Sequence, residues 1–428
     1  MKPTWAIPSV VLLLGMFIYL SFNLHSKAGY ISWKSEIYAD KAGYYVYLPA
    51  AFIYKFNASA FPDAIDSLCG NGFRIDRKNN RIRTKYPYGT ALLQTPFFLS
   101  AHVLAKPLGY RDDGFSVIYH KSISIAAAVY LLLALMFLYK FLERYFRRSN
   151  AMLTLFLLLG GTNIFYYGLV DTGMSHVYSF FVFSLSLWIF KRWSEEQGSP
   201  GWNMFSLGLA AGLIFALRHI NLIFLVFVFF LDIAGPAELK YRLKRFFAFP
   251  GIFFALLPFL AVALPQLAYN HYQGGSVFYH AYHGESFANY ACPKLAELWF
   301  STRNGLFTYS PANILILTGA VIMIAHNIRN GWLSLALFMI LSYIFASWWM
   351  WWFGCGYGGR TFVEYYALLS LPVGYSLKFL NRISILPLKY ILWMLLLLMV
   401  AWNITLIYKY PRCWFWGIWD WERLVGLL

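Results

Sequence analysis

The sequence is poor in charged residues. Only 12% of its 428 residues are Asp, Glu, Lys or Arg, whereas 60% are hydrophobic, so a water-soluble fold would have too little polar surface. A hydrocarbon core about 30 Å thick takes roughly 20 apolar residues per helix, which leaves room for about ten spans in a chain of this length. The composition therefore excludes an ordinary soluble domain and predicts a single membrane domain over residues 1–428.

Acidic residues are especially scarce, with 18 Asp and Glu against 35 Lys and Arg. A net charge of +17 would suit a nucleic-acid partner, but the basic residues lie in short clusters between apolar runs, as in cytoplasmic loops. These loops contain neither a GxxxxGK[ST] nor a GxGxxG motif, which argues against a nucleotide site in them. We therefore predict no nucleic-acid partner, and membrane lipids as the surroundings.

The basic clusters predict the path of the chain through the membrane. They lie at 140–148, 191–192, 240–245, 326–329 and 378–389. With all of them on the cytoplasmic side, the N-terminus is cytoplasmic and the chain ends outside. About 11 transmembrane helices are then expected, near 6–24, 116–139, 151–168, 173–190, 203–217, 220–236, 248–269, 308–325, 332–350, 361–377 and 390–408.

Two long segments fall on the outer side of this path. The first extracytoplasmic loop is 25–115 and the second is 271–307. No small-residue cleavage pattern follows the first span, so we expect it to be a retained anchor. The apolar stretch 90–108 is long enough to cross, but an additional crossing would move 140–148 outside. We expect an interfacial or re-entrant helix there.

Cysteine is also rare. Cys69, Cys292, Cys355 and Cys413 all fall on the outer side of the predicted path, where three pairings into two disulfides are possible and unpaired buried thiols are equally compatible. No CxxC or His/Cys ligand spacing indicates zinc, and we predict no metal site.

The unusual polar residues gather on the outer side, and ionisable groups beside spans are costly enough to suggest a site. They are Glu36, Asp40, Lys85, Asp171, His176, Arg218, His219, the region 270–303, Arg360 and Glu364.

Two of these residues belong to the first loop. Asp40 opens an aromatic stretch with Tyr44 and Tyr45, where a carboxylate can accept a proton from a hydroxyl while the rings hold a sugar; the alternative is an Asp that caps an interfacial helix. Lys85 can neutralise a phosphate at the head-group level, or simply extend toward the lipid surface.

The later outer segments carry further candidates. His280, Arg303 and the aromatic residues around them suit sugar stacking and phosphate binding, although an aromatic membrane belt has a similar composition. Arg360 follows a glycine-rich turn that lets the backbone approach a ligand and can bind a phosphate with two hydrogen bonds. The alternative is an internal ion pair between Arg360 and Glu364.

Together these segments resemble the polytopic, lipid-phosphosugar-dependent glycosyltransferases of the GT-C fold, especially the bacterial dolichyl-phosphate-mannose-protein-mannosyltransferase-like group. The resemblance rests on Asp40 with Tyr44 and Tyr45, the KYPYGTALLQTPFF segment, His176 at the start of a span, the FSTRNGLFTYSP stretch and the Tyr-Gly-Gly-Arg turn at 357–360.

The resemblance implies an all-α, GT-C-like integral membrane protein whose large first extracytoplasmic loop carries interfacial helices. It would be a hexosyl- or pentosyltransferase of the cell inner (plasma) membrane that uses a polyprenyl-phosphate-linked sugar and inverts the anomeric carbon. Asp40 would be the general base, and Lys85, Arg303 and Arg360 would bind the donor phosphate. Further substrate-binding residues would be His176, Tyr44, Tyr45, Glu364, His280, Arg218 and His219.

The sequence departs from the common family pattern at its acidic pair, because Asp40 is followed by Lys41. We therefore expect no obligatory divalent metal or other cofactor. No large domain follows the last span, so recognition of a glycan, lipid or protein acceptor is expected from the outer loops, chiefly 41–84 and 271–307.

Two other functional classes remain open. A transporter or flippase of a lipid-linked or polar substrate should show paired repeats and polar groups near the bilayer midplane, but the chain shows no convincing repeat and its polar groups lie at one face. An O-antigen ligase or polymerase usually has one large late loop, whereas the largest predicted loop here is the first.

Overall fold

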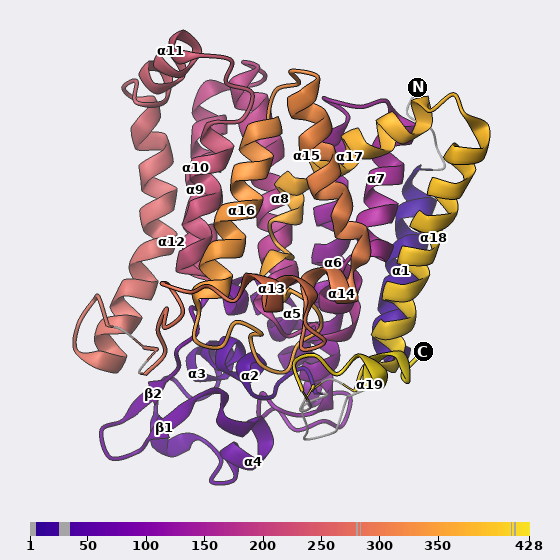
Figure 1. Ribbon diagram of the computed structural model, residues 1–428. Helices are drawn as coiled ribbons and strands as arrows, with labels where there is room; N and C mark the ends of the chain where they lie inside the picture. The colour runs from indigo at the N-terminus through magenta and orange to yellow at the C-terminus, as the bar shows by residue number, and fades with distance from the viewer. Residues whose placement is uncertain (1–5, 25–34, 280, 283, 412, 415–416) are drawn as a thin grey trace.

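The computed structural model describes residues 6–24, 35–279, 281–282, 284–411, 413–414 and 417–428. A helix lies at each of the eleven predicted span positions, and these helices form the bundle in Figure 1. They are α1 (Ala6–Leu24), α6 (Val117–Leu142), α7 (Arg148–Gly161), α8 (Ser175–Ser194), α9 (Pro200–Leu217), α10 (Leu222–Phe229), α12 (Gly251–Gly274), α15 (Ile314–Ala325), α16 (Gly331–Ser347), α17 (Tyr366–Arg382) and α18 (Leu386–Lys409).

Within the described ranges, four helices are long and apolar enough to cross a membrane, namely α6, α9, α12 and α18. Shorter apolar helices lie at 8–23, 219–229, 311–325 and 331–347. The chain therefore has the helices of a membrane protein, but the expected count of about eleven crossings is not confirmed.

Small residues let the long helices pack closely. A Cβ atom on Gly208 of α9 would lie 1.8 Å from the carbonyl oxygen of Ala255 in α12, so the two backbones meet at a position that only glycine fits. Such contacts are typical of helices that pack in lipid, where apolar burial alone does not drive association.

Two predicted spans end earlier than hydropathy suggests. The stretch predicted at 151–168 stops as α7 at Gly161 and continues as a π-helix, η3 (Tyr166–Val170). The stretch predicted at 220–236 begins with η4 (His219–Asn221) and ends as the short helix α10. It ends there because the Asp232 carboxylate accepts hydrogen bonds from Tyr145 at 2.7 Å and Lys191 at 2.6 Å, which fixes a turn.

The first-loop elements form a separate layer beneath the bundle in Figure 1. They are α2 (Asp40–Tyr45), α3 (Tyr47–Phe52), η1 (Ala58–Ala60), α4 (Ile65–Cys69), η2 (Gly70–Gly72), β1 (Arg74–Asp76), β2 (Arg81–Arg83) and α5 (Gly89–Ala105). An apolar cluster of its own, which includes Val46, Ile82 and Phe98, holds this layer together. The strands β1 and β2 form an antiparallel hairpin, so the all-α expectation is wrong at this point, whereas a helix does occupy the stretch 90–108.

Short elements of the later loops close the same end of the bundle. They are α13 (Leu295–Phe300), α14 (Leu306–Tyr309), η5 (Pro311–Asn313), η6 (Arg360–Phe362) and α19 (Trp421–Val425). A disulfide joins Cys355 to Cys413, whereas Cys69 is buried and Cys292 exposed, each as a free thiol. The basic helix α11 (Pro236–Phe246) lies at the opposite end of the molecule (Figure 1).

Candidate active site

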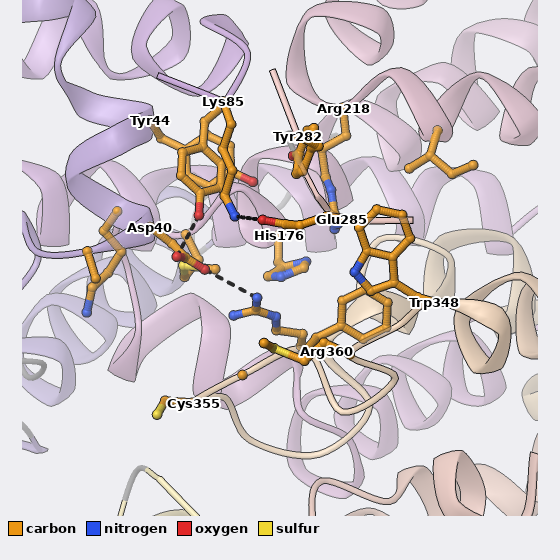
Figure 2. A pocket seen from close by; sticks show the side chains of 18 of the residues that line it. Asp40, Tyr44, Lys85, His176, Arg218, Tyr282, Glu285, Trp348, Cys355 and Arg360 are labelled. Carbon is orange, nitrogen blue, oxygen red and sulfur yellow. Dashed lines mark hydrogen bonds and ion pairs between the residues drawn. The ribbon is translucent and has the colours of Figure 1, made fainter. Parts of the chain in front are cut away.

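A cavity of about 560 Å³ lies where the first-loop layer meets the bundle. Its wall combines charged side chains from segments that are far apart in the sequence with a row of aromatic rings. Figure 2 shows the charged groups pointing into one space. The charged and histidine residues of the wall are Asp40, Lys41, Lys85, Asp171, His176, Arg218, His219, Glu285 and Arg360.

Asp40 is the first residue of α2, and the backbone before it is strained. Ala39 has φ 51° and ψ −131°, a conformation that residues with a Cβ atom rarely adopt. A hydrogen bond of 2.7 Å from the Ala39 N–H to the Cys69 carbonyl holds this turn. Ala39 is the residue at the helix cap and no side chain caps this end, so the interpretation of Asp40 as a capping residue is wrong.

The Asp40 carboxylate has two partners in the cavity. Tyr86 Oη donates a hydrogen bond of 2.6 Å to Oδ1, and Arg360 Nη2 lies 3.3 Å from Oδ2. Burial raises the pKa of Asp40, but Arg360, the Tyr86 hydrogen bond and Lys85 together outweigh it, so the pKa lies below its ordinary value. The side chain remains 40% exposed, so the ionised carboxylate is accessible from the cavity.

A glycine allows Tyr86 to reach Asp40. A Cβ atom on Gly43 would lie 2.2 Å from the Tyr86 ring, so the ring lies directly against the backbone of α2. Tyr86 also packs against Tyr44, with ring centroids 4.5 Å apart, and Tyr44 accepts a hydrogen bond of 3.2 Å from Ser175.

Arg360 is positioned by the glycine-rich turn that precedes it. The Tyr357 N–H donates a hydrogen bond of 2.9 Å to Tyr167 Oη, and Asn163 Nδ2 donates one of 3.2 Å to the Tyr357 carbonyl. The Cys355–Cys413 disulfide fixes the start of the same turn, and both cysteines line the cavity. Arg360 pairs with Asp40, so the alternative of an internal ion pair with Glu364 does not form.

Glu364 belongs instead to a buried charge cluster. It is fully buried, and its carboxylate lies 2.9 Å from His176 Nδ1 and 3.2 Å from Arg218 Nη1. His176 and Arg218 line the cavity, whereas Glu364 lies behind them. The carboxylate therefore orients two groups that a substrate can contact.

Lys85 connects the first loop to the second outer segment. Its ammonium group forms an ion pair with Glu285 and lies 5.3 Å from the ring centroid of Tyr282. Figure 2 shows this pair spanning one side of the cavity. An anionic ligand can therefore replace Glu285 as the partner of this ammonium group.

Lys41 and Asp171 form a second buried ion pair, with a distance of 2.9 Å and side-chain exposures of 7% and 9%. Asp171 directly follows the π-helix η3, an element that often occurs at functional sites. Charges buried this deeply are tolerated only as pairs.

The remaining wall is aromatic. Rings from the second loop and from the end of α16 face the charged groups, and such surfaces stack against sugar rings and apolar chains. The ring-bearing residues on this side are Tyr282, Phe287, Phe345, Trp348, Trp349 and Phe353.

The predicted site residues divide into three groups. Asp40, Tyr44, Lys85, His176, Arg218, His219 and Arg360 line the cavity. Glu364, Tyr45 and Arg303 do not: Tyr45 donates to the Gly114 carbonyl at 2.5 Å, and the Arg303 guanidinium lies 4.9 Å from the Trp352 ring. His280 lies outside the described residues.

Several lining residues were not among the predicted site residues, namely Lys41, Tyr86, Asp171, Tyr282 and Glu285. Asp171 and the region 270–303 had been named among the outer-side polar residues, and Lys41 and Tyr86 lie next to Asp40 and Lys85, so the local signal was present. In the described part of the chain, no group of three or more His, Cys, Asp and Glu side chains could hold a metal ion.

No protein-family model and no curated protein matches the sequence. Solved structures of the Archaeoglobus fulgidus oligosaccharyltransferase do match. The form tethered to an acceptor peptide with an NVT sequon is 15% identical with a TM-score of 0.50, over 95% of this chain and 55% of that chain. The same protein, AglB, with an inhibitory peptide and a dolichol-phosphate is 16% identical with a TM-score of 0.49, over the same shares of the two chains.

This chain therefore spans about half the length of the solved structures that it matches. At 15% identity the match concerns the fold alone. Because the tethered form overlaps almost the whole of this chain at a TM-score of 0.50, the resemblance deduced from the sequence is confirmed at the level of architecture: this chain has the GT-C fold.

Proposed function

We propose that the chain is a membrane glycosyltransferase that moves a sugar from a polyprenyl-phosphate donor to an acceptor hydroxyl, with inversion at the anomeric carbon. The observation that carries the proposal is the cavity itself. It brings an ionised, accessible carboxylate, Asp40, together with the cations Lys85 and Arg360 and an aromatic wall. A base, a phosphate-binding pair and a surface for a sugar ring are what this reaction requires.

The proposed reaction is a single displacement. Asp40 accepts the proton of the acceptor hydroxyl as its oxygen attacks the anomeric carbon. The bond from that carbon to the phosphate oxygen breaks, and the phosphate leaves with the bonding electrons. Lys85 and Arg360 stabilise its negative charge. Because Arg360 contacts Asp40 at 3.3 Å, a bound phosphate competes with Asp40 for the guanidinium and leaves the carboxylate free to act as base.

We propose that this transfer has no obligatory divalent metal. A metal between Asp40 and Asp171 would need both carboxylates, but the Lys41 ammonium group already pairs with Asp171 at 2.9 Å in a buried position. The residues present therefore do not fit a divalent ion, because a fixed positive charge stands beside its ligands. The Lys41 ammonium group instead supplies the positive charge that a metal ion would bring to the cavity.

We further propose that the cavity opens on the extracytoplasmic side of the inner membrane. The Cys355–Cys413 disulfide is part of its wall, and disulfides persist in oxidising compartments. The solved structure of the same fold holds an acceptor peptide, which supports transfer to an acceptor at such a cavity.

The test is a deletion strain complemented with the wild-type chain or with Asp40→Asn. Mass spectrometry of membrane lipids and surface glycans should show a product one sugar heavier with the wild type. With Asp40→Asn, transfer should fall by about 10²–10⁴-fold, the usual contribution of a general base.

Asp66→Asn is the matched control, because Asp66 is an exposed carboxylate of the same loop. It should restore the product fully, and immunoblots should show both variants in the membrane. Wild-type product levels with Asp40→Asn would exclude Asp40 as the base.

A further inference from the structure

The hairpin β1–β2 presents one apolar and one charged face. Its register pairs Arg74 with Arg83, Ile75 with Ile82 and Asp76 with Arg81. Ile82 is fully buried, and Ile75 packs against the same apolar cluster. Because side chains alternate along a strand, the other two pairs face away from that cluster.

The outward face has an excess of positive charge. Residues 74–83 contain five basic side chains and one acidic side chain. Arg83 pairs with Asp76 at 2.9 Å and Arg77 with Asp63 at 3.0 Å, and throughout the described ranges Arg74, Lys78 and Arg81 form no salt bridge. We call Arg74, Lys78, Arg81 and Arg83 the basic face.

The register makes this charge costly. Arg74 and Arg83 are directly opposite each other, and like charges in that relation destabilise a strand pair. The ion pair of Arg83 with Asp76 offsets part of this cost, and an anion bound between the two guanidinium groups would offset the rest.

The hairpin is rigidly attached to the end of α12. Tyr272 Oη accepts a hydrogen bond of 3.1 Å from the Ile82 N–H, and Tyr269 Oη donates one of 2.8 Å to the Ile82 carbonyl. The Thr84 N–H donates at 3.1 Å to Gln273 Oε1. The basic face is therefore held in place and does not depend on a flexible loop.

The same strand leads directly into the cavity. Only Thr84 separates Arg83 from Lys85 in the sequence, so their Cα atoms lie at most about 7 Å apart. Lys85 lines the cavity. A chain-like ligand that crosses the basic face can thus reach the cavity mouth.

We propose that the basic face binds an acceptor glycan that carries several carboxylate or phosphate groups, and guides its end toward the cavity. The role of this glycan as acceptor rests on the proposed function. A face that docks on a bilayer combines basic residues with Trp, Phe or Leu that insert into lipid, whereas the outward positions of this hairpin are Arg74, Asp76, Arg81 and Arg83. The charge pattern therefore fits a soluble polyanion.

The test measures binding to the full chain in nanodiscs of neutral phosphatidylcholine. The probe is hexagalacturonate, with maltohexaose as the neutral sugar of equal length. The triple variant Arg74→Gln, Lys78→Gln, Arg81→Gln should bind hexagalacturonate about tenfold more weakly, since three exposed ion pairs contribute about twofold each. Maltohexaose should bind no better to the wild type than to this variant.

The matched control removes three exposed cations elsewhere in the first loop: Lys55→Gln, Lys106→Gln, Arg111→Gln. This control should keep wild-type affinity. Raising the ionic strength from about 0.01 to about 0.1 M shortens the screening length from about 30 to about 10 Å, so it should weaken wild-type binding more than binding by the hairpin variant. Equal affinities of the hairpin variant and the control would overturn the proposal.

A lipid role gives a different result. If phosphatidylglycerol in the nanodisc abolishes hexagalacturonate binding by the wild type and by the control variant, both of which keep the basic face, that face binds head groups and the proposal is wrong. Retained binding supports it.

The two proposals fail separately. Asp40→Asn should bind hexagalacturonate as the wild type does, because binding needs no turnover. Wild-type transfer at limiting acceptor with the hairpin variant would overturn the docking inference and leave the catalytic one standing. Wild-type transfer by Asp40→Asn would overturn the assignment of Asp40 as the base and leave the docking inference standing.

Discussion

Two cavities of similar volume differ in almost every other respect. The candidate active site measures about 560 Å³ and contains four basic side chains, three of which pair with carboxylates of the same wall. The other measures about 500 Å³ and is lined by α8, α9, α10, α11 and α12 with apolar side chains, Ser186 being the exception. It lies toward the end of the bundle that carries α11.

The difference shows that volume alone does not identify a site. Charges held beside apolar helices cost free energy even when they are paired, and apolar side chains of similar size are often more stable. The apolar cavity carries no such cost. The cavity whose wall retains three ion pairs is therefore the better candidate for a functional site.

The largest expected effect concerns the buried cluster behind the site. Glu364→Gln leaves Arg218 and His176 without their carboxylate, which should destabilise the protein by about 3–5 kcal/mol. Glu143→Gln is the control, because Glu143 pairs with Arg148 on the surface at 3.4 Å, and its loss should cost less than about 1 kcal/mol. Thermal unfolding in detergent measures both. Equal effects would mean that burial of the cluster is not what stabilises it.

The same substitution in each cavity should separate their roles. Ile344 lines the candidate active site and Ile252 the apolar cavity. Ile344→Trp fills space needed by substrate and should lower transfer by at least about tenfold, whereas Ile252→Trp should leave it unchanged and alter stability by about 1–3 kcal/mol. Transfer is assayed in membranes. A larger loss with Ile252→Trp than with Ile344→Trp would contradict the proposed difference between the two cavities.

The ion pair at Lys41 predicts a response to metals. EDTA should not affect transfer by the wild type. Lys41→Ser leaves Asp171 without its ammonium partner, so transfer should fall and be partly restored by Mg²⁺ or Mn²⁺. Lys106→Ser, at an exposed position, should behave as the wild type does. Loss of wild-type activity in EDTA would refute metal independence.

The smallest expected effect is a shift in pH dependence. The Tyr86 hydrogen bond helps Arg360 and Lys85 to lower the pKa of Asp40. Tyr86→Phe removes that bond, so the pKa rises and the acid limb of the pH profile moves to higher pH. Tyr88→Phe, whose hydroxyl donates to the Val262 carbonyl, should leave the limb in place. If the acid limb moves equally in both variants, the shift comes from a general loss of packing and not from the lost hydrogen bond to Asp40.

Much of the fold could be predicted because long apolar runs leave the chain few alternatives. Helices α6, α12 and α18 lie close to their predicted limits. The ends of α7 and α10 could not be predicted, since both depend on distant partners: Asn163 bonds to Tyr357, and Asp232 bonds to Tyr145. The hairpin was also missed, although the basic run at 74–83 was visible in the sequence.

The pairing of the charged side chains could not be predicted from the sequence. Their common side of the predicted path grouped Asp40, Lys85 and Arg360, and the structure places all three in one cavity wall. The sequence offered Glu364, one helical turn away, as the alternative partner of Arg360, yet the partner is Asp40, 320 residues earlier. The tertiary structure sets which carboxylate pairs with which cation, because the two partners of each pair come from distant segments that hydropathy does not distinguish.

The disulfide between Cys355 and Cys413 has a consequence for the order in which the cavity is assembled. It closes a loop of 58 residues, which is worth about 4 kcal/mol in the chain-entropy account, and both of its ends belong to the cavity wall. Packing of the helices therefore completes the bundle but not the cavity wall. The wall is complete only once the thiols of Cys355 and Cys413 have been oxidised to the disulfide.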